Sequence, residues 1–99
     1  MAFEFLRQWF ARSPRQRPDL HILVYTRAAC PLCHEAWELL HTYQQRYAFV
    51  LECKDVDDSA DLLREFGQSV PVVTINGQVR FRGHVNEVLL RRLLEAKAD

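Results

Sequence analysis

The sequence is poor in glycine and proline, which account for only three and four of its 99 residues. Disordered and collagen-like chains need far more of both, so these classes are excluded. The sequence also lacks any run of the roughly 20 apolar residues that a membrane-spanning helix needs. It has no net charge, since 13 basic side chains balance 13 acidic ones, and no overall charge attracts it to nucleic acid. A single packed domain is therefore predicted, because this length suffices for one hydrophobic core.

A secretion signal is also missing from the start of the sequence. Glu4 and Arg7 interrupt the apolar residues there, and no small-residue cleavage site follows. The cysteine count, three, is odd, whereas small secreted domains usually carry an even number that pair as disulfides. Both features predict a cytoplasmic protein. In that reducing compartment, the spacing of Cys30 and Cys33 indicates redox or metal chemistry.

The first 18 residues differ in composition from the rest. They carry four arginines and one glutamate, a net charge of +3, whereas residues 19–99 carry nine basic and twelve acidic side chains, a net charge of −3. Their apolar residues follow a 3.6-residue period, which predicts a short amphipathic helix with one apolar side: Phe3, Phe5, Leu6, Trp9 and Phe10. Residues 13–18, which include two prolines, predict a linker. We therefore expect a basic segment over 1–18, which docks on the domain of residues 19–99, on a second copy or on a membrane surface.

From residue 21 onward the hydrophobic pattern is regular. A β-branched and aromatic run predicts a buried strand over residues 21–26, and Pro31 begins a helix that extends to about residue 47. Alternating residues predict a second strand over 48–54, followed by a short helix over 60–66. Asn76 and Gly77 favour a tight turn between strands 72–75 and 78–81, and Asn86 caps a last helix that ends near residue 96. This order predicts an α/β fold with a four-stranded mixed sheet and flanking helices.

The same patterns predict which side chains are buried. On the long helix the inward stripe comprises Cys33, Ala36, Trp37, Leu40, Tyr43 and Tyr47. On the second strand the better-buried face comprises Phe49, Leu51 and Cys53. Gly67 is expected to end the short helix in a left-handed conformation. On the last helix the expected inward residues are Val88, Leu89, Leu93 and Leu94.

The chemistry of the sequence concentrates in Cys30, Pro31, Leu32 and Cys33, at a predicted strand-to-helix junction. Thiol–disulfide exchange requires one thiolate that attacks a disulfide and a second thiol that resolves the mixed disulfide. A helix N-terminus stabilises a thiolate through its free N–H groups and its dipole, which favours Cys30 as nucleophile and Cys33 as the buried resolving thiol. Because the dipole alone supplies only about 0.3–1 kcal/mol, Arg27 is the nearest candidate for a further stabilising charge.

Two segments of the sequence resemble the glutaredoxins, a family with the thioredoxin fold. The stretch from Tyr25 to Cys33 is similar to their active-site loop, which has the pattern Cys-Pro-Tyr-Cys and a basic residue three positions before the first cysteine. Ser69, Val70 and Pro71 resemble their Thr-Val-Pro segment. The resemblance covers about residues 20–97. It implies a three-layer thioredoxin-like fold, a cis peptide bond before Pro71, and a Val70 backbone that pairs with the bound substrate.

The resemblance also implies how a substrate is bound. Pro31 keeps its place in the active-site loop, and Leu32 stands where the glutaredoxins have tyrosine. Where they carry Gly-Gly-x-Asp to hold glutathione, this sequence has Gly83, His84, Val85 and Asn86. The implied activity is the reduction of protein or glutathione mixed disulfides. Glutathione or thioredoxin reductase would supply the electrons, and no tightly bound cofactor is expected.

Other interpretations of the cysteine pair stay open. The fold could serve as a non-catalytic binding module, or the pair could share an iron–sulfur cluster between two chains. A closed zinc site requires four ligands, and no second Cys or His pair has suitable spacing, so no metal ligands are predicted. Cys30, Cys33 and His34 also match the c-type haem attachment motif. That reading is disfavoured because there is no export signal and no methionine after Met1 to serve as a distal ligand.

Overall fold

The computed structural model describes residues 16–96, and the predicted amphipathic helix near the start lies outside these residues. In chain order the elements are β1 (His21–Thr26), α2 (Pro31–Tyr47), β2 (Val50–Asp55), the 3₁₀ helix η1 (Val56–Asp58), α3 (Ala60–Phe66), β3 (Val72–Ile75), β4 (Gln78–Arg82) and α4 (Glu87–Glu95). The predicted order of strand, helix, strand, helix, hairpin and helix is confirmed, with small differences at the ends of elements.

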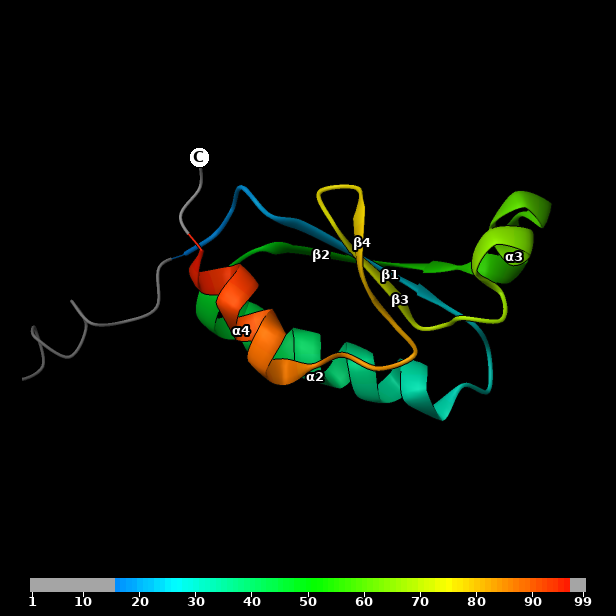
Figure 1. The fold of residues 1–99 in the computed structure, drawn as a ribbon, viewed down its shortest axis with the longest axis horizontal. Helices are drawn as coiled ribbons and strands as arrows, with labels where there is room; N and C mark the ends of the chain where they lie inside the picture. Colours follow the sequence, from blue (N-terminus) through cyan, green and yellow to red (C-terminus); the bar gives the residue numbers. More distant parts are fainter. Residues whose placement is uncertain (1–15, 97–99) are drawn as a thin grey trace, which may run out of the picture.

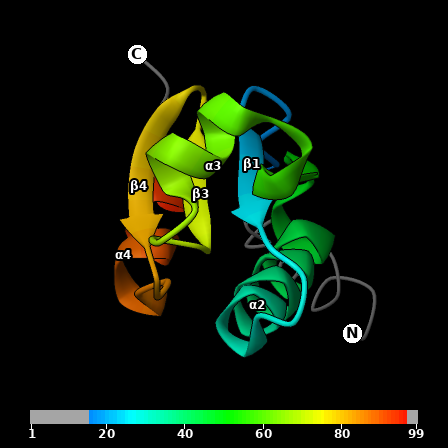
Figure 2. The same ribbon diagram turned by 90° about the vertical axis from the view of Figure 1, so that its right-hand side faces the viewer.

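The sheet is mixed and has the strand order β2-β1-β3-β4. The β1 strand pairs in parallel with β2 and antiparallel with β3, which pairs antiparallel with β4. Helices α2 and α4 cover one face of the sheet, and the short α3 lies on the other side at one end (Figures 1 and 2). The predicted α/β fold with three layers is therefore confirmed. None of the helices within residues 16–96 has the length and apolar character needed to cross a membrane.

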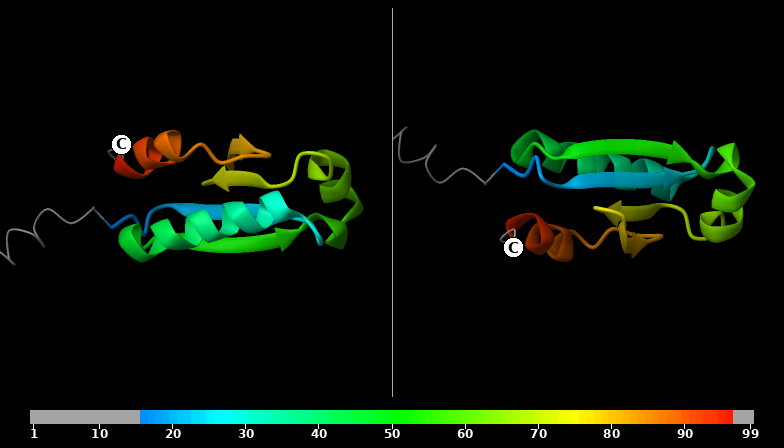
Figure 3. Two further views of the ribbon diagram at one scale, coloured as in Figure 1. Left: turned by 90° about the horizontal axis from the view of Figure 1, so that it is seen from below. Right: turned by 90° about the horizontal axis from the view of Figure 1, so that it is seen from above.

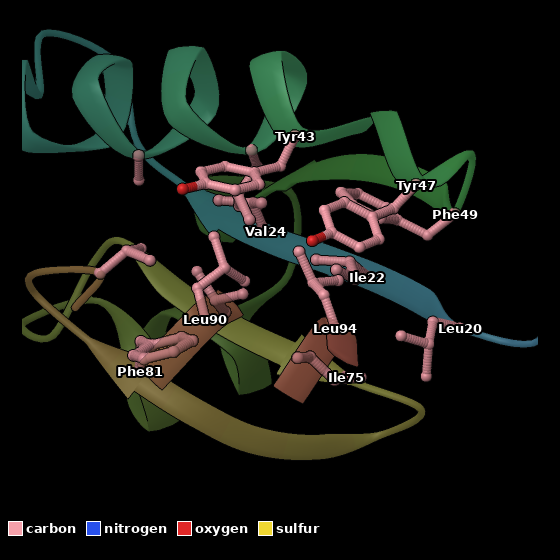
Figure 4. Packing of buried hydrophobic residues seen from close by; sticks show 14 residues of the cluster. Leu20, Ile22, Val24, Tyr43, Tyr47, Phe49, Ile75, Phe81, Leu90 and Leu94 are labelled. Atoms are coloured by element: carbon pink, nitrogen blue, oxygen red, sulfur yellow. The ribbon is translucent and has the colours of Figure 1, made fainter. Parts of the chain in front are cut away.

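The larger hydrophobic core lies between the sheet and the pair α2 and α4 (Figure 4). Its fully buried residues include Ile22 and Val24 of β1, Leu40 of α2, and Leu90 and Leu94 of α4. A smaller cluster of Val56, Phe66 and Val72 lies under α3, where the Tyr25 ring stacks on Phe66 with centroids 4.6 Å apart. Both clusters include residues of β1 and β3, so the strands that precede and follow the loops are packed on both faces of the sheet.

Two tyrosines of α2 link this helix to α4. The Tyr43 hydroxyl donates to Glu87 Oε2 at 2.6 Å, and the Tyr47 hydroxyl donates to Glu95 Oε1 at 2.5 Å. Burial, reinforced by the Glu95 carboxylate, raises the pKa of Tyr47 to about 12. Burial and Glu87 also raise the pKa of Tyr43. Both tyrosines are buried, as the helical spacing predicted.

The β3–β4 hairpin turns at the predicted dipeptide. Asn76 and Gly77 both have positive φ, 51° and 83°, which is the geometry that this pair tolerates best. Asn76 also receives a hydrogen bond on its side-chain oxygen from the His21 N–H, at 2.7 Å. The turn therefore fastens the hairpin to the first residue of β1.

The prediction for α4 was wrong at two positions. Val88 and Leu89 are about half exposed (50% and 46%), whereas Leu90 and Leu94 are fully buried. Leu90 and Leu94 are four residues apart and therefore lie on the same side of the helix. This is the side of α4 that packs against the sheet. Four leucines and a valine in seven residues offer more than one apolar stripe, and only packing against the sheet selects between them.

Gly67 also differs from the prediction. Its φ is −55°, a right-handed helical value, and its N–H donates to the Leu63 carbonyl oxygen at 2.9 Å. A Cβ at this position would lie 2.4 Å from that same oxygen, so glycine is required for space and not for a left-handed turn. The left-handed helix end occurs instead at Ala48, which follows α2 with a φ of 55°.

Arg17 falls in the predicted linker, yet its side chain is buried. Its guanidinium donates to the carbonyl oxygens of Leu94 at 2.8 Å and Ala96 at 2.5 Å. It also forms an ion pair with Asp19 at 2.9 Å, and its backbone N–H donates to the Tyr47 carbonyl. The residue therefore connects the segment before β1 to the C-terminal ends of α2 and α4.

Candidate active site

Cys30 and Cys33 lie where the loop after β1 leads into α2. Cys30 is the N-cap residue of this helix, with extended backbone angles, and Pro31 follows it at the start of the helix. The Cys30 sulfur accepts a hydrogen bond from the Cys33 N–H at 3.2 Å. The two side chains form a disulfide, with their Cα atoms 5.2 Å apart. One of the free N–H groups of the helix end is thus directed at the sulfur that would carry negative charge after reduction.

The two cysteines differ in their access to solvent. Cys33 is only 4% exposed, as its place on the inward stripe predicted, whereas Cys30 is partly exposed. Cys30 lines an open depression of about 670 Å³, together with Thr26, Arg27, Ala29, Pro31, Cys33, His34 and Trp37. An incoming molecule can therefore reach the sulfur of Cys30, while most of Cys33 is covered by the protein.

Arg27 lines the same depression, three residues before Cys30. Its Nε donates to Asp57 Oδ2 at 3.1 Å, and both side chains are exposed by more than 40%. Asp57 lies in η1, where its own N–H donates to Asp55 Oδ1 at 2.8 Å. The cation expected to stabilise the thiolate thus has a carboxylate partner, Asp57, which lies 30 residues away along the chain.

The Val70–Pro71 peptide bond is cis in the structure. Pro71 is fully buried and Val70 is partly buried. The Pro71 carbonyl accepts a hydrogen bond from the Gly83 N–H at 2.8 Å, so the segment before β3 contacts the segment after β4. Neither Val70 nor Pro71 is among the residues that line the depression around Cys30.

Three other predicted binding residues meet at a second, smaller hollow on the opposite side of the first turn of α2. A hollow of about 50 Å³ is lined by Leu32, Gly83 and His84, together with Glu35, Ala36, Leu39 and Val85. Gly83 has a positive φ of 77°, a backbone conformation that favours glycine. Asn86 caps α4 as predicted, because its Oδ1 accepts the Leu89 N–H at 3.0 Å.

Cys53 is exposed and is not in a disulfide, so the prediction that it is buried was wrong. Its Sγ lies 3.3 Å from the Thr26 hydroxyl, next to the end of β1. The alternation holds at the start of the segment, where Phe49 is 2% exposed, but it fails toward the end of the strand. Phe49 and Leu51 belong to the larger hydrophobic core, whereas Cys53, further along the edge strand β2, does not.

His34, Trp37 and Asp57 were not predicted as parts of the site. A signal for the first two exists in the sequence, because positions 34 and 37 lie one and two turns beyond Cys30 on the same side of a helix. Asp57 gives no such signal, since it approaches Arg27 only through the pairing of β1 with β2. Within residues 16–96, no group of three or more His, Cys, Asp or Glu side chains is placed to hold a metal ion.

Two comparisons with known proteins agree with this geometry. A solved structure, the oxidised thioredoxin from Plasmodium falciparum, is similar to this chain with a TM-score of 0.56. The similarity covers 90% of this chain and 88% of that chain at 18% sequence identity, which shows a shared thioredoxin-like fold. The family model of the glutaredoxin-like domain (DUF836) matches residues 21–95, a range that includes both cysteines and the last helix. The chain therefore belongs to the glutaredoxin-like (DUF836) domain family.

Proposed function

We propose that the protein is a thiol–disulfide oxidoreductase that uses Cys30 as nucleophile and Cys33 as resolving thiol. The observation that carries this proposal is the disulfide between an accessible cysteine at the N-cap of α2 and a buried cysteine one turn later. A pair that reaches bonding distance without unfolding can cycle between dithiol and disulfide. The different access of the two sulfurs supports different roles for them.

In the reduced protein, the Cys30 thiolate attacks one sulfur of a substrate disulfide. A bond forms between Cys30 and that sulfur, and the other substrate sulfur leaves as a thiolate, which takes a proton from water. Cys33 then loses its proton and attacks the Cys30 sulfur, which releases the second substrate thiol. Two electrons thereby pass from the cysteine pair to the substrate, and the pair is left as the disulfide. Glutathione or a thioredoxin reductase supplies two electrons to restore the dithiol.

The substrate is a protein disulfide or a glutathione mixed disulfide. In this proposal the Val70 backbone, next to Pro71, aligns the substrate, and Pro31 and Leu32 contact it beside Cys30. Gly83, His84 and Asn86 form the second side of the binding surface. The hydrogen bond from the Gly83 N–H to the Pro71 carbonyl keeps these two loops next to each other, which supports their use by one substrate. The proposed location is the reducing cytoplasm, where an exposed thiol such as Cys53 persists.

The test is turnover with two substrates, insulin and a glutathione mixed disulfide. Cys30→Ser should abolish turnover of both, because serine does not provide a thiolate at neutral pH. Cys33→Ser should prevent turnover that requires internal resolution, and Cys53→Ser serves as the control and should match the wild type. Comparing glutathione with thioredoxin reductase as electron donor identifies the reductant. Equal rates for the wild type and Cys30→Ser would refute the proposed function.

A further inference from the structure

We propose that Asp57 is a positioning residue that pairs with Arg27 and, by compensating its charge, limits the stabilisation of the Cys30 thiolate. The inference rests on the proposed function, since it concerns Cys30 as the nucleophile. It assigns a role to a carboxylate outside the Cys-Pro-Leu-Cys segment, and this role sets the reactivity of the thiol.

The position of Asp57 follows from the sheet. Thr26 and Asp55 form the last pair of the parallel ladder between β1 and β2, so the residues after them lie at the same edge. Figure 3 shows both strands pointing toward the end of the molecule where α3 lies. There Arg27 Nε donates to Asp57 Oδ2 at 3.1 Å. Asp57 is itself held by the hydrogen bond of its N–H to Asp55 Oδ1 at 2.8 Å.

This contact directs the guanidinium toward η1. Arg27 and Cys30 line the same depression, whereas Asp57 is not among the lining residues. Asp57 therefore compensates part of the charge of Arg27 without itself lining the depression. Because the side chains are 44% and 42% exposed, the pair is weak, and its loss should leave the fold intact.

Other charged groups near the thiol remain unchanged when Asp57 is replaced. His34 lines the depression and lies 3.9 Å from Glu38 on the next turn of α2. Glu35 and His84 line the smaller hollow on the other side of the helix. Asp58 neighbours Asp57 in η1 and is exposed, and within residues 16–96 Arg27 pairs with Asp57 and not with Asp58. It therefore provides a matched control with the same change in net charge.

Asp57→Asn keeps the shape of the side chain and removes its negative charge, so the charge of Arg27 beside the depression is no longer compensated. Because a nearby positive charge favours the thiolate over the thiol, the pKa of Cys30 should fall. Alkylation at a pH below the pKa of Cys30 should then be faster, by a few-fold at most. Asp58→Asn should cause a much smaller shift. Arg27→Gln should raise the pKa, and in its presence Asp57→Asn and Asp58→Asn should no longer differ.

The measurement is the rate of alkylation of the reduced protein by iodoacetamide across the pH range, read on the peptide that contains Cys30. All variants carry Cys53→Ser, because this exposed thiol would also react. A larger shift for Asp57→Asn than for Asp58→Asn, lost in the Arg27→Gln background, supports the proposal. Equal shifts for the two variants, or a difference that persists without Arg27, would overturn it. Alkylation needs no turnover, so the activity of Cys30→Ser tests the proposed function separately.

Discussion

Arg17→Ala should lower the free energy of unfolding by about 2–4 kcal/mol. Arg17 is 4% exposed, and its guanidinium donates to the Leu94 carbonyl at 2.8 Å in a buried position. A hydrogen bond that involves a charged group contributes about 1.5–3 kcal/mol, and a cation at a helix C-terminus adds about 0.3–1 kcal/mol. The bonds to Ala96 and Asp19 are only partly buried, so water replaces them and their loss adds little.

The assay is urea and thermal unfolding followed by circular dichroism. For a domain of this size, the expected loss corresponds to a fall in Tm of about 10–25 °C. Arg92→Ala is the control, because Arg92 lies in the last turn of α4 but is exposed. Its replacement should change the free energy of unfolding by less than about 0.5 kcal/mol. Arg17→Lys should be intermediate, since lysine keeps the charge but not the planar set of donors. If Arg17→Ala and Arg92→Ala proved equally stable, the argument from buried hydrogen bonds would be refuted.

Two further predictions concern the α2–α4 layer. Leu90→Ala should lower the free energy of unfolding by about 2–5 kcal/mol, whereas Leu89→Ala, at a position 46% exposed, should lower it far less. Chemical denaturation measures both losses, and equal losses would contradict the observed packing. The raised pKa of Tyr47, about 12, means that the folded state keeps its proton at a pH where the unfolded state loses it. Stability should therefore decrease as the pH rises from 10 toward 12, by at most about 2.7 kcal/mol, and urea midpoints for Tyr47→Phe should lack most of this decrease.

Most elements of the fold were predictable because their signals are short-range. Pro31 at the start of α2, the turn at Asn76 and Gly77, and the Asn86 cap each depend on a few neighbouring residues. These residues restrict the backbone directly, through a locked φ, a tolerated positive φ or a side-chain hydrogen bond. The structure confirms all three, and the element order follows from them.

Burial was less predictable wherever two stripes were similarly apolar or a strand lay at the edge of the sheet. The sequence does not identify Leu90 as buried, because the leucines of α4 can form several apolar stripes. Only packing against the sheet decides which stripe is buried. Alternation predicts an inward Cys53 because it does not reveal where along the edge strand β2 the hydrophobic core ends. The sequence predicts a linker at Arg17 because no local pattern indicates that the carbonyl oxygens at the end of α4 lie beside it.

The candidate site likewise has features that the sequence predicts and features that only the tertiary structure shows. Sequence alone determined that Cys30 and Cys33 are one turn apart at a helix start, because the spacing and Pro31 impose that geometry within four residues. Only the tertiary structure decided which groups surround them. Arg27 meets Asp57 because two strands pair in parallel in one particular register, and Gly83 meets Pro71 because the loops around a hairpin converge. Such contacts depend on chain packing across long sequence separations, which local residue preferences do not specify.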